Sequence, residues 1–196
     1  MALTNSTRGM AAACGMSPLS NTFCRLFPEP NDGPGSGKIG MKHSDSVLLN
    51  DTSFMQAALA EAHAAAVNGE VPVGCVIVVG NRIVARAGNR TIANCDPTAH
   101  AEIVALRTAA KELGNYRLSG AAAYVTVEPC AMCAGAMIQA RIARVVYGCD
   151  DAKGGAVRTC FNIFGHPALN HRVEVLGGVL AEECAEAMQN FFAARR

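Results

Sequence analysis

Two cysteines and one histidine stand where a protein can hold a metal ion. Cys130 and Cys133 are three residues apart at the start of a predicted helix, so both sulfurs reach one ion. The free amides of a helix N-terminus favour the thiolate, which is the form that binds metal. His100 stands at the start of the preceding predicted helix and adds a nitrogen ligand. One nitrogen, two sulfurs and an open fourth position are typical of a catalytic zinc site.

Glu102 is the candidate acid-base group beside this site. It is too close to His100 in sequence for a comfortable fourth ligand, but it is well placed to touch a water in the open position. A zinc-bound water has a pKa of about 7, and a neighbouring carboxylate can carry its proton elsewhere. The residues together therefore predict a zinc-activated water.

Two other interpretations of the cysteines stay open at this point. A C-x-x-C pair between a strand and a helix is also the arrangement of thioredoxin-type redox proteins, in which two thiols cycle through a disulfide. A structural zinc site is the second alternative, and it needs a fourth ligand. The candidates for that ligand are Cys95, Cys149, Cys160 and His171.

Helices and strands are predicted to alternate from residue 50 onward. Capping oxygens at residues 51–53 precede a helix that ends at Asn68-Gly69. Gly80-Asn81 makes a two-residue turn, which predicts a hairpin. Thr98 is the expected N-cap of the next helix. The predicted strands are 73–79, 82–87, 122–127, 142–147 and 173–175, and the later helices are 98–113, 130–140 and a last one from about 179.

This order of elements implies one α/β domain over residues 50–196. We expect three layers, α/β/α, with a central mixed sheet of about five strands and helices on its faces. The histidine and cysteine fragments each lie where a strand leads into a helix. The parallel strand order is therefore expected to bring His100 alongside Cys130.

Residues 1–49 differ from the rest of the chain. They are rich in Ser, Thr, Asn, Gly and Pro and contain a run of turn-forming residues at 31–37. Because no periodic segment occurs there, we expect a disordered N-terminal extension. An upstream start codon with Met41 as the alternative start is a second explanation, and a targeting segment, to which only Arg8 and Arg25 point, is a third.

Length and composition exclude several classes of protein. The 196 residues are 51% hydrophobic and 17% charged, which excludes a wholly disordered chain. No apolar run reaches the roughly 18 residues of a membrane span, so no membrane partner is expected. The net charge of +1 gives no global field for nucleic acid. The 9 cysteines, an odd number, indicate a reducing compartment such as the cytoplasm.

The metal-site fragments resemble a known signature. His100-Ala-Glu102 and Pro129-Cys-Ala-Met-Cys133 are similar to the H-x-E and P-C-x-x-C motifs of the zinc-dependent cytidine-deaminase-like superfamily. The similarity covers residues 52–196 and is to bacterial tRNA-specific adenosine deaminases. The other matching segments are Glu70–Gly74, Gly88–Arg90, Asp96–Glu102, Asn115–Leu118, Tyr124–Met137 and Leu169–Glu174.

The resemblance implies an enzyme that converts the wobble adenosine of an arginine tRNA anticodon loop to inosine. It implies that His100, Cys130 and Cys133 hold one Zn²⁺ per subunit and that a zinc-activated water attacks C6 of adenine. Glu102 is then expected to take the proton of the water, protonate the ring nitrogen and assist the loss of ammonia. Asn89 is expected to hydrogen-bond the flipped base. A cytoplasmic homodimer is also implied, with its interface on the helices near the cysteine segment.

The chain departs from the family pattern at three places. Gln139 stands where His is common, Cys149 where a small residue is usual, and Arg158–Cys160 in place of Gly-Ser-Leu. They lie in and after the segment that is expected to help hold the RNA loop and the dimer. Residues 141–172 are locally basic, which predicts a rim that contacts phosphate groups. The cations of this segment are Arg141, Arg144, Lys153, Arg158 and Arg172, and its acids are Asp150 and Asp151.

Two other functions are compatible with the zinc signature. Deamination of a free base or nucleoside, such as guanine or cytosine, is the first, and the long match that includes Asn170–Arg172 speaks against it. A non-catalytic, zinc-stabilised RNA-binding module is the second. Replacement of Glu102 by Ala tests it, because only a catalytic protein depends on that carboxylate.

Overall fold

The protein is described here by a computed structural model, which describes residues 43–195, with side chains from residue 50 onward. The predicted disordered extension lies, up to residue 42, outside the described residues. The elements in chain order are α1 (His43–Val67), β1 (Gly74–Val79), β2 (Arg82–Gly88), α2 (Ala101–Glu112), β3 (Ala122–Val127), α3 (Ala131–Gln139), β4 (Arg144–Cys149), β5 (Glu174–Gly177) and α4 (Ala181–Ala193). Of these helices, none is long and apolar enough to cross a membrane.

The five strands form one mixed sheet in the order β2-β1-β3-β4-β5. β1 is antiparallel to both β2 and β3, whereas β3, β4 and β5 are mutually parallel. Because β2 and β3 both run against β1, they point in the same direction. Their carboxyl ends therefore meet one edge of the sheet, and α2 and α3 begin at that edge.

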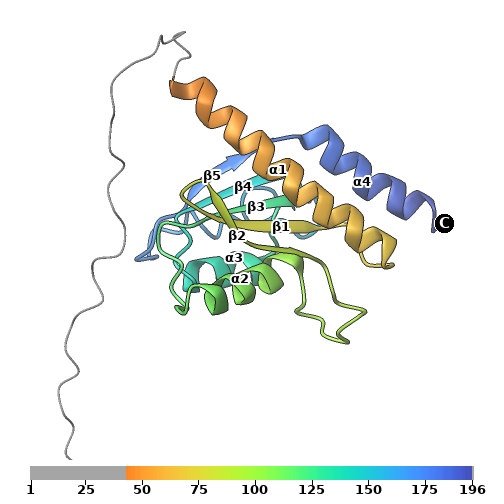
Figure 1. Ribbon diagram of the computed structural model, residues 1–196, viewed down its shortest axis with the longest axis horizontal. Coiled ribbons are helices and arrows are strands. Elements are labelled where there is room, and N and C mark those ends of the chain that lie inside the picture. Colours follow the sequence, from red (N-terminus) through yellow and green to blue (C-terminus); the bar gives the residue numbers. More distant parts are fainter. Residues whose placement is uncertain (1–42, 196) are drawn as a thin grey trace, which may run out of the picture. The chain divides into compact units, whose positions relative to one another are not determined.

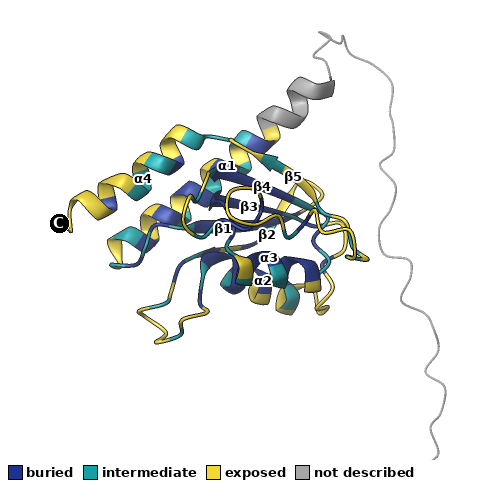
Figure 2. Cartoon of the chain, turned by 180° about the vertical axis from the view of Figure 1, so that it is seen from behind, coloured by how far each residue is buried: buried dark blue, intermediate teal, exposed yellow. Residues whose placement is uncertain are grey.

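The helices cover both faces of the sheet (Figure 1). α1 and α4 lie on one face and α2 and α3 on the other, so the prediction of a three-layer α/β/α domain with about five strands is confirmed. The central strands β1, β3 and β4 are buried along most of their length, and the outer faces of the helices are exposed (Figure 2). The layers follow from the alternation of side chains along each strand.

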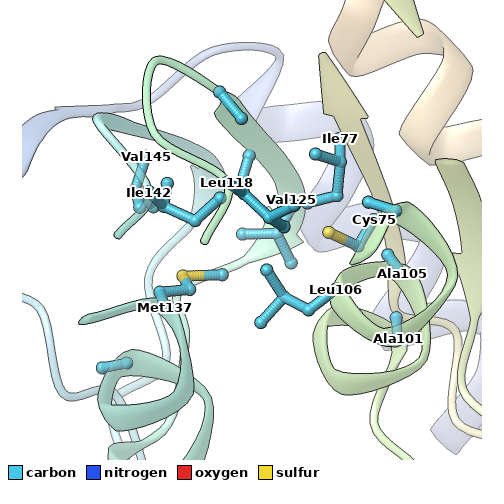
Figure 3. Close-up of a cluster of buried hydrophobic side chains, with 14 of the residues drawn as sticks. Cys75, Ile77, Ala101, Ala105, Leu106, Leu118, Val125, Met137, Ile142 and Val145 are labelled. Carbon is cyan, nitrogen blue, oxygen red and sulfur yellow. The ribbon is translucent and has the colours of Figure 1, made fainter. Parts of the chain in front are cut away.

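Strand β1 shows how one sequence serves two apolar cores. Cys75 and Ile77 point to the side of α2 and α3 and join the cluster in Figure 3. Val76 and Val78 point to the side of α1 and α4. All four are nearly inaccessible to water. Since both faces of this strand are covered, its sequence is a continuous apolar run rather than an alternating one.

Helix α1 packs closely on β1 because of one glycine. A Cβ atom on Gly74 would lie 1.9 Å from the carbonyl oxygen of Ala58, so no other residue fits without displacing the helix. The amide of Gly74 donates a hydrogen bond to the hydroxyl of Thr126 on β3 at 3.1 Å. The backbones of α1 and β1 are thus in contact, and β1 pairs with β3, the strand that leads to the candidate site.

Two predicted helix starts are wrong. α1 begins at His43 rather than after Asp51, because no glycine or proline interrupts residues 43–67 and extension of an existing helix is inexpensive. α2 begins at Ala101 with His100 as its N-cap, rather than with Thr98. The hydroxyl of Thr98 instead donates to Asp96 at 2.7 Å, in the turn that precedes the helix.

Candidate metal centre and active site

The three predicted metal ligands lie together at the edge of the sheet where α2 and α3 begin. The ligand atoms of His100, Cys130 and Cys133 are all within 4.8 Å of one another. Nδ1 of His100 is 3.7 Å from Sγ of Cys130 and 3.6 Å from Sγ of Cys133. No further histidine, cysteine or carboxylate in the described part of the chain joins this group.

These distances fit a tetrahedral zinc ion. Zn–S bonds of about 2.3 Å and Zn–N bonds of about 2.0–2.1 Å at a tetrahedral angle place nitrogen and sulfur about 3.6 Å apart. The donor set of one imidazole and two thiols is one that zinc prefers. Cys95, Cys149, Cys160 and His171, the candidates for a fourth structural ligand, are absent from the group, so the residues form an open three-ligand site.

The two cysteines occupy different positions at the start of α3. Cys130 is the N-cap and Cys133 lies in the first turn, where it is fully buried. Hydrogen bonds from Cys133 and His100 lower the pKa of the Cys130 thiol to about 4. A thiolate at this position meets the positive end of the helix and is ready to bind a metal.

Glu102 lies beside the three ligands and carries an unsatisfied oxygen. The residue is 3% exposed, and its Oε2 atom is the buried side-chain oxygen or nitrogen without a hydrogen-bond partner among the described residues. Burial raises the pKa of this carboxyl group. A buried acceptor without a partner is costly, so this oxygen is suited to a small polar group that enters the site.

Asn89 is held in one orientation by the start of α2. Its Oδ1 accepts a hydrogen bond from the backbone amide of Ala101 at 2.8 Å. Asn89 follows β2 directly and is 8% exposed. Because Oδ1 faces the helix, the Nδ2 hydrogens are the groups that Asn89 can offer to a molecule in the pocket.

A pocket of about 260 Å³ joins the predicted residues. Asn89, His100, Glu102 and Cys130 all line it, whereas the fully buried Cys133 does not. The wall also contains residues that the sequence did not reveal as part of a site. They are Val71, Val73, Thr91, Val127, Glu128, Asp151 and Met188.

Two of these additional positions carry a sequence signal in hindsight. Glu128 lies two residues before Cys130, and Thr91 lies two residues after Asn89, so both are close to predicted site residues in the chain. Asp151 and Met188 come from the segment after β4 and from α4. Only the packing of these distant segments brings them to the pocket.

Glu128 is a buried carboxylate in the wall of the pocket. Its burial raises the pKa, but backbone amides of Thr159, Arg158 and Asp151 outweigh this effect, so that the net pKa is lowered. The group is therefore a charged acceptor. The segment after β4 folds around it.

The predicted basic rim is wrong for Arg144. Its guanidinium donates to both carboxylate oxygens of Asp51, at 2.7 and 3.0 Å, and its Nε donates to Glu174 at 2.9 Å. Asp51 also accepts from the hydroxyl of Tyr124 at 2.7 Å. The Asp51–Arg144 ion pair ties α1 to the sheet. The sequence predicts Asp51 as a helix cap, but Asp51 lies within α1 and its carboxylate faces Arg144 on β4.

Most other cations of this segment also have partners within the chain. Arg158 pairs with Asp150 at 2.5 Å, and Nη1 of Arg141 donates to the side-chain oxygen of Asn170 at 3.0 Å. Arg172 donates to backbone carbonyl groups at 3.2 Å. The Arg158–Asp150 pair is exposed, so these charges still face solvent.

The three departures from the family pattern lie in different places. Gln139 is the last residue of α3 and lines a hollow between α2 and α3, and Cys149 ends β4. Residues 158–160 close the loop that begins at residue 150. Their side chains bond Asp150, Asp151 and Ala152 in turn, each eight residues earlier.

Comparison with known proteins assigns the chain to a family. Residues 49–196 match the MafB19-like deaminase family. A tRNA-specific adenosine deaminase of Agrobacterium fabrum is 48% identical over 149 residues, which cover 76% of this chain and 98% of the relative. The corresponding enzyme of Haemophilus influenzae is 48% identical over 147 residues, which cover 74% of this chain and 85% of the relative.

Solved structures agree with this assignment. A structure from studies of A-to-I editing by tRNA:A34 deaminases has a TM-score of 0.68 and 48% identity, and covers 69% of this chain and 99% of that one. A guanine deaminase of Nitrosomonas europaea has a TM-score of 0.60 at 19% identity, covers 83% of this chain and all of that one, and shares the fold. The chain, with its open His/Cys/Cys site and adjoining buried glutamate, belongs to the tRNA-specific adenosine deaminase family.

Proposed function

We propose that this protein deaminates the wobble adenosine of a tRNA anticodon loop to inosine by hydrolysis. The observation that carries the proposal is Oε2 of Glu102, which has no hydrogen-bond partner among the described residues and lies beside a group of three possible metal ligands. The tRNA substrate rests on relatives that are named tRNA-specific adenosine deaminases and are 48% identical.

His100, Cys130 and Cys133 are the residues that would hold the metal, and we infer one Zn²⁺ per subunit. Bound zinc supplies Lewis acidity and makes water a nucleophile near neutral pH. Three protein ligands would leave room on the metal for that water. Removal of zinc with a chelator should abolish deamination, and added zinc should restore it, with metal content measured in parallel.

Glu102 is the residue that moves protons in this proposal. Its buried carboxylate can accept one proton from water and give it to the ring nitrogen, and then take the second proton from the new hydroxyl at C6 and give it to the amino group, which leaves as ammonia. Burial favours the protonated form, so the proton is held rather than released to solvent.

Asn89 is the residue that orients the base. Its Oδ1 is engaged by Ala101, so it presents Nδ2 hydrogens to an acceptor on the base. The base must leave the anticodon stack to enter a pocket of about 260 Å³, as in other enzymes that act on a base.

The decisive test is incubation of the protein with a transcript of an arginine tRNA that carries adenosine at the wobble position. We expect inosine at that position and release of ammonia, and inosine mapping on total tRNA measures the breadth of substrates. An unchanged transcript together with turnover of free guanine would favour the free-base alternative. The similarity to guanine deaminases, at 19% identity, reaches only the fold.

We also propose that the protein is a homodimer that uses the faces of α2 and α3. These helices flank a hollow of about 430 Å³, whose residues are mostly apolar, and Tyr116 at its rim is 68% exposed. Substitution of Ala136 by a charged residue should give monomers in light scattering.

We also infer that the reaction takes place in the cytoplasm, because the proposed substrate is a tRNA and tRNA is used there.

A further inference from the structure

Five hydrogen-bond donors converge on the carboxylate of Glu128. Oε1 accepts from the backbone amides of Val157, Arg158 and Thr159, at 3.0, 2.7 and 3.0 Å. Oε2 accepts from the amide of Asp151 at 3.2 Å and from the hydroxyl of Thr159 at 2.9 Å. The carboxylate thus lies at the centre of the loop that runs from residue 150 to residue 160.

The same loop is attached to the turn that carries a metal ligand. Cys130 forms an isolated β-bridge with Gly155, and the amide of Ala156 donates to the carbonyl of Pro129 at 2.8 Å. Glu128 itself is 2% exposed and precedes this turn directly. Loop and turn are therefore one hydrogen-bonded unit.

Packing inside this unit leaves little freedom. A Cβ atom on Gly155 would lie 2.3 Å from Oε2 of Glu128 and 2.3 Å from the hydroxyl of Thr159. That hydroxyl also lies 2.6 Å from the carbonyl oxygen of Asp151, so its single hydrogen serves one of the two acceptors at a time. Asp151 lines the pocket beside the metal site, so the hydrogen bonds of Glu128 fix a piece of the pocket wall.

We propose that Glu128 is a positioning residue for the deamination reaction. It holds Asp151 and the Cys130 turn in one fixed relation, so that the substrate nucleotide meets a preformed wall. This inference rests on the proposed function. It predicts that loss of the hydrogen bonds between Glu128 and the loop weakens substrate binding, because the pocket wall must then become ordered when the substrate binds.

All five donors are satisfied only by a side chain whose two terminal atoms both accept hydrogen bonds, as the oxygens of a carboxylate do. The variant Glu128→Gln keeps an oxygen for Val157, Arg158 and Thr159, but places an amide NH₂ opposite the Asp151 amide. Two hydrogen-bond donors then face each other, so the hydrogen bond to the amide of Asp151 is lost selectively.

The experiment compares the zinc-loaded full chain with Glu128→Gln, Thr159→Val and Thr159→Ser, on the wobble-adenosine tRNA. We expect Glu128→Gln to raise KM about tenfold and to keep kcat within about threefold, since a preformed wall contributes uniform binding. Zinc content should stay at the wild-type value. Hydrogen exchange at the Asp151 amide should become faster. Thr159→Val should also raise KM. Thr159→Ser keeps the hydroxyl and should have a KM close to that of the wild type.

An unchanged KM in Glu128→Gln, or a loss of kcat in proportion to lost zinc, would overturn the positioning role. If Glu128→Gln does not fold, the Thr159→Val and Thr159→Ser pair decides, and equal KM values would overturn it. A wild-type protein that leaves the tRNA unchanged contradicts the proposed function. An active wild type with an unchanged KM in the variants contradicts only the inference about Glu128.

Discussion

The side-chain oxygen of Asn89 accepts a hydrogen bond from the backbone amide of Ala101, at a distance of 2.8 Å. Ala101 is the first residue of α2 and separates His100 from Glu102. The bond therefore joins the residue proposed to orient the base with the segment that carries a metal ligand and the proposed proton carrier. It also satisfies one of the free amides at the start of the helix.

This bond leads to a prediction for Asn89→Asp. A carboxylate keeps the acceptor for Ala101 and suits the helix N-terminus, but it has no hydrogen to offer to the base. We expect folding and zinc content to be retained, while kcat/KM for tRNA falls by about 10²–10³-fold. Kinetics on the wobble-adenosine transcript measure the effect. Full activity of this variant would contradict the proposed role of the Nδ2 group.

Glu102→Gln tests the proton carrier. The amide cannot accept and return a proton, so we expect kcat to fall by at least about 10²–10⁴-fold with zinc still bound. Single-turnover kinetics and metal analysis check the two halves of this expectation. Loss of zinc along with activity would instead indicate that the carboxylate stabilises the metal site. Survival of both would refute the role.

Arg144→Leu should destabilise the fold. The variant leaves Asp51, whose side chain is 2% exposed, as a buried charge without its partner. We expect the free energy of unfolding to fall by about 3–5 kcal/mol in urea denaturation. The matched control is Arg158→Leu, which removes an exposed ion pair and should cost about 0–1 kcal/mol. Equal effects of the two substitutions would contradict the assignment of Arg144 as a structural residue.

Glu70 should make stability depend on pH in the acidic range. The carboxylate is 1% exposed and accepts bonds from the amides of Ile92 and Ala93 and the hydroxyl of Thr91, at 2.8 to 2.9 Å. Burial alone would raise the pKa of Glu70, but these bonds lower it below the ordinary 4.5. The stabilisation is therefore present above pH 4.5 and is lost as the pH falls through the lower folded-state pKa.

The variant Glu70→Gln measures this contribution. We expect it to cost about 1–3 kcal/mol at pH 7, since a charged acceptor is replaced by a neutral one. The difference from the wild type should shrink as the pH falls from 4.5 through the lower folded-state pKa, below which Glu70 is protonated in both folded and unfolded chains. Urea denaturation at a series of pH values gives the difference directly. A difference that is the same at every pH would show that the charge of Glu70 contributes nothing.

Local sequence patterns determined the architecture and the chemistry of the site. The alternation of apolar segments and turn residues gave the order of helices and strands, and the hairpin at Gly80-Asn81 joins β1 and β2 as predicted. The spacing of Cys130 and Cys133 at a helix start predicted that both sulfurs face one ion, and the strand order brings them beside His100. These features depend on a few neighbouring residues, whose geometry the backbone fixes.

Long-range packing decided what the patterns could not. Asp51 resembles a capping residue in the sequence, but its carboxylate pairs with Arg144, 93 residues away. A polar side chain takes whichever partner the folded chain brings closest, and the sequence shows only the near ones.

The sequence by itself determined the order of elements and indicated the candidate metal ligands, because apolar periodicity, turn residues and the three-residue spacing of Cys130 and Cys133 are local patterns. The tertiary structure alone decided that Glu128 gathers the loop after β4, that Asp151 and Met188 reach the pocket, and that Oε2 of Glu102 finds no partner in the part of the chain that the structure describes. The reason is that burial and hydrogen-bond partnership are properties of the packed chain. They arise only when segments that are distant in sequence meet.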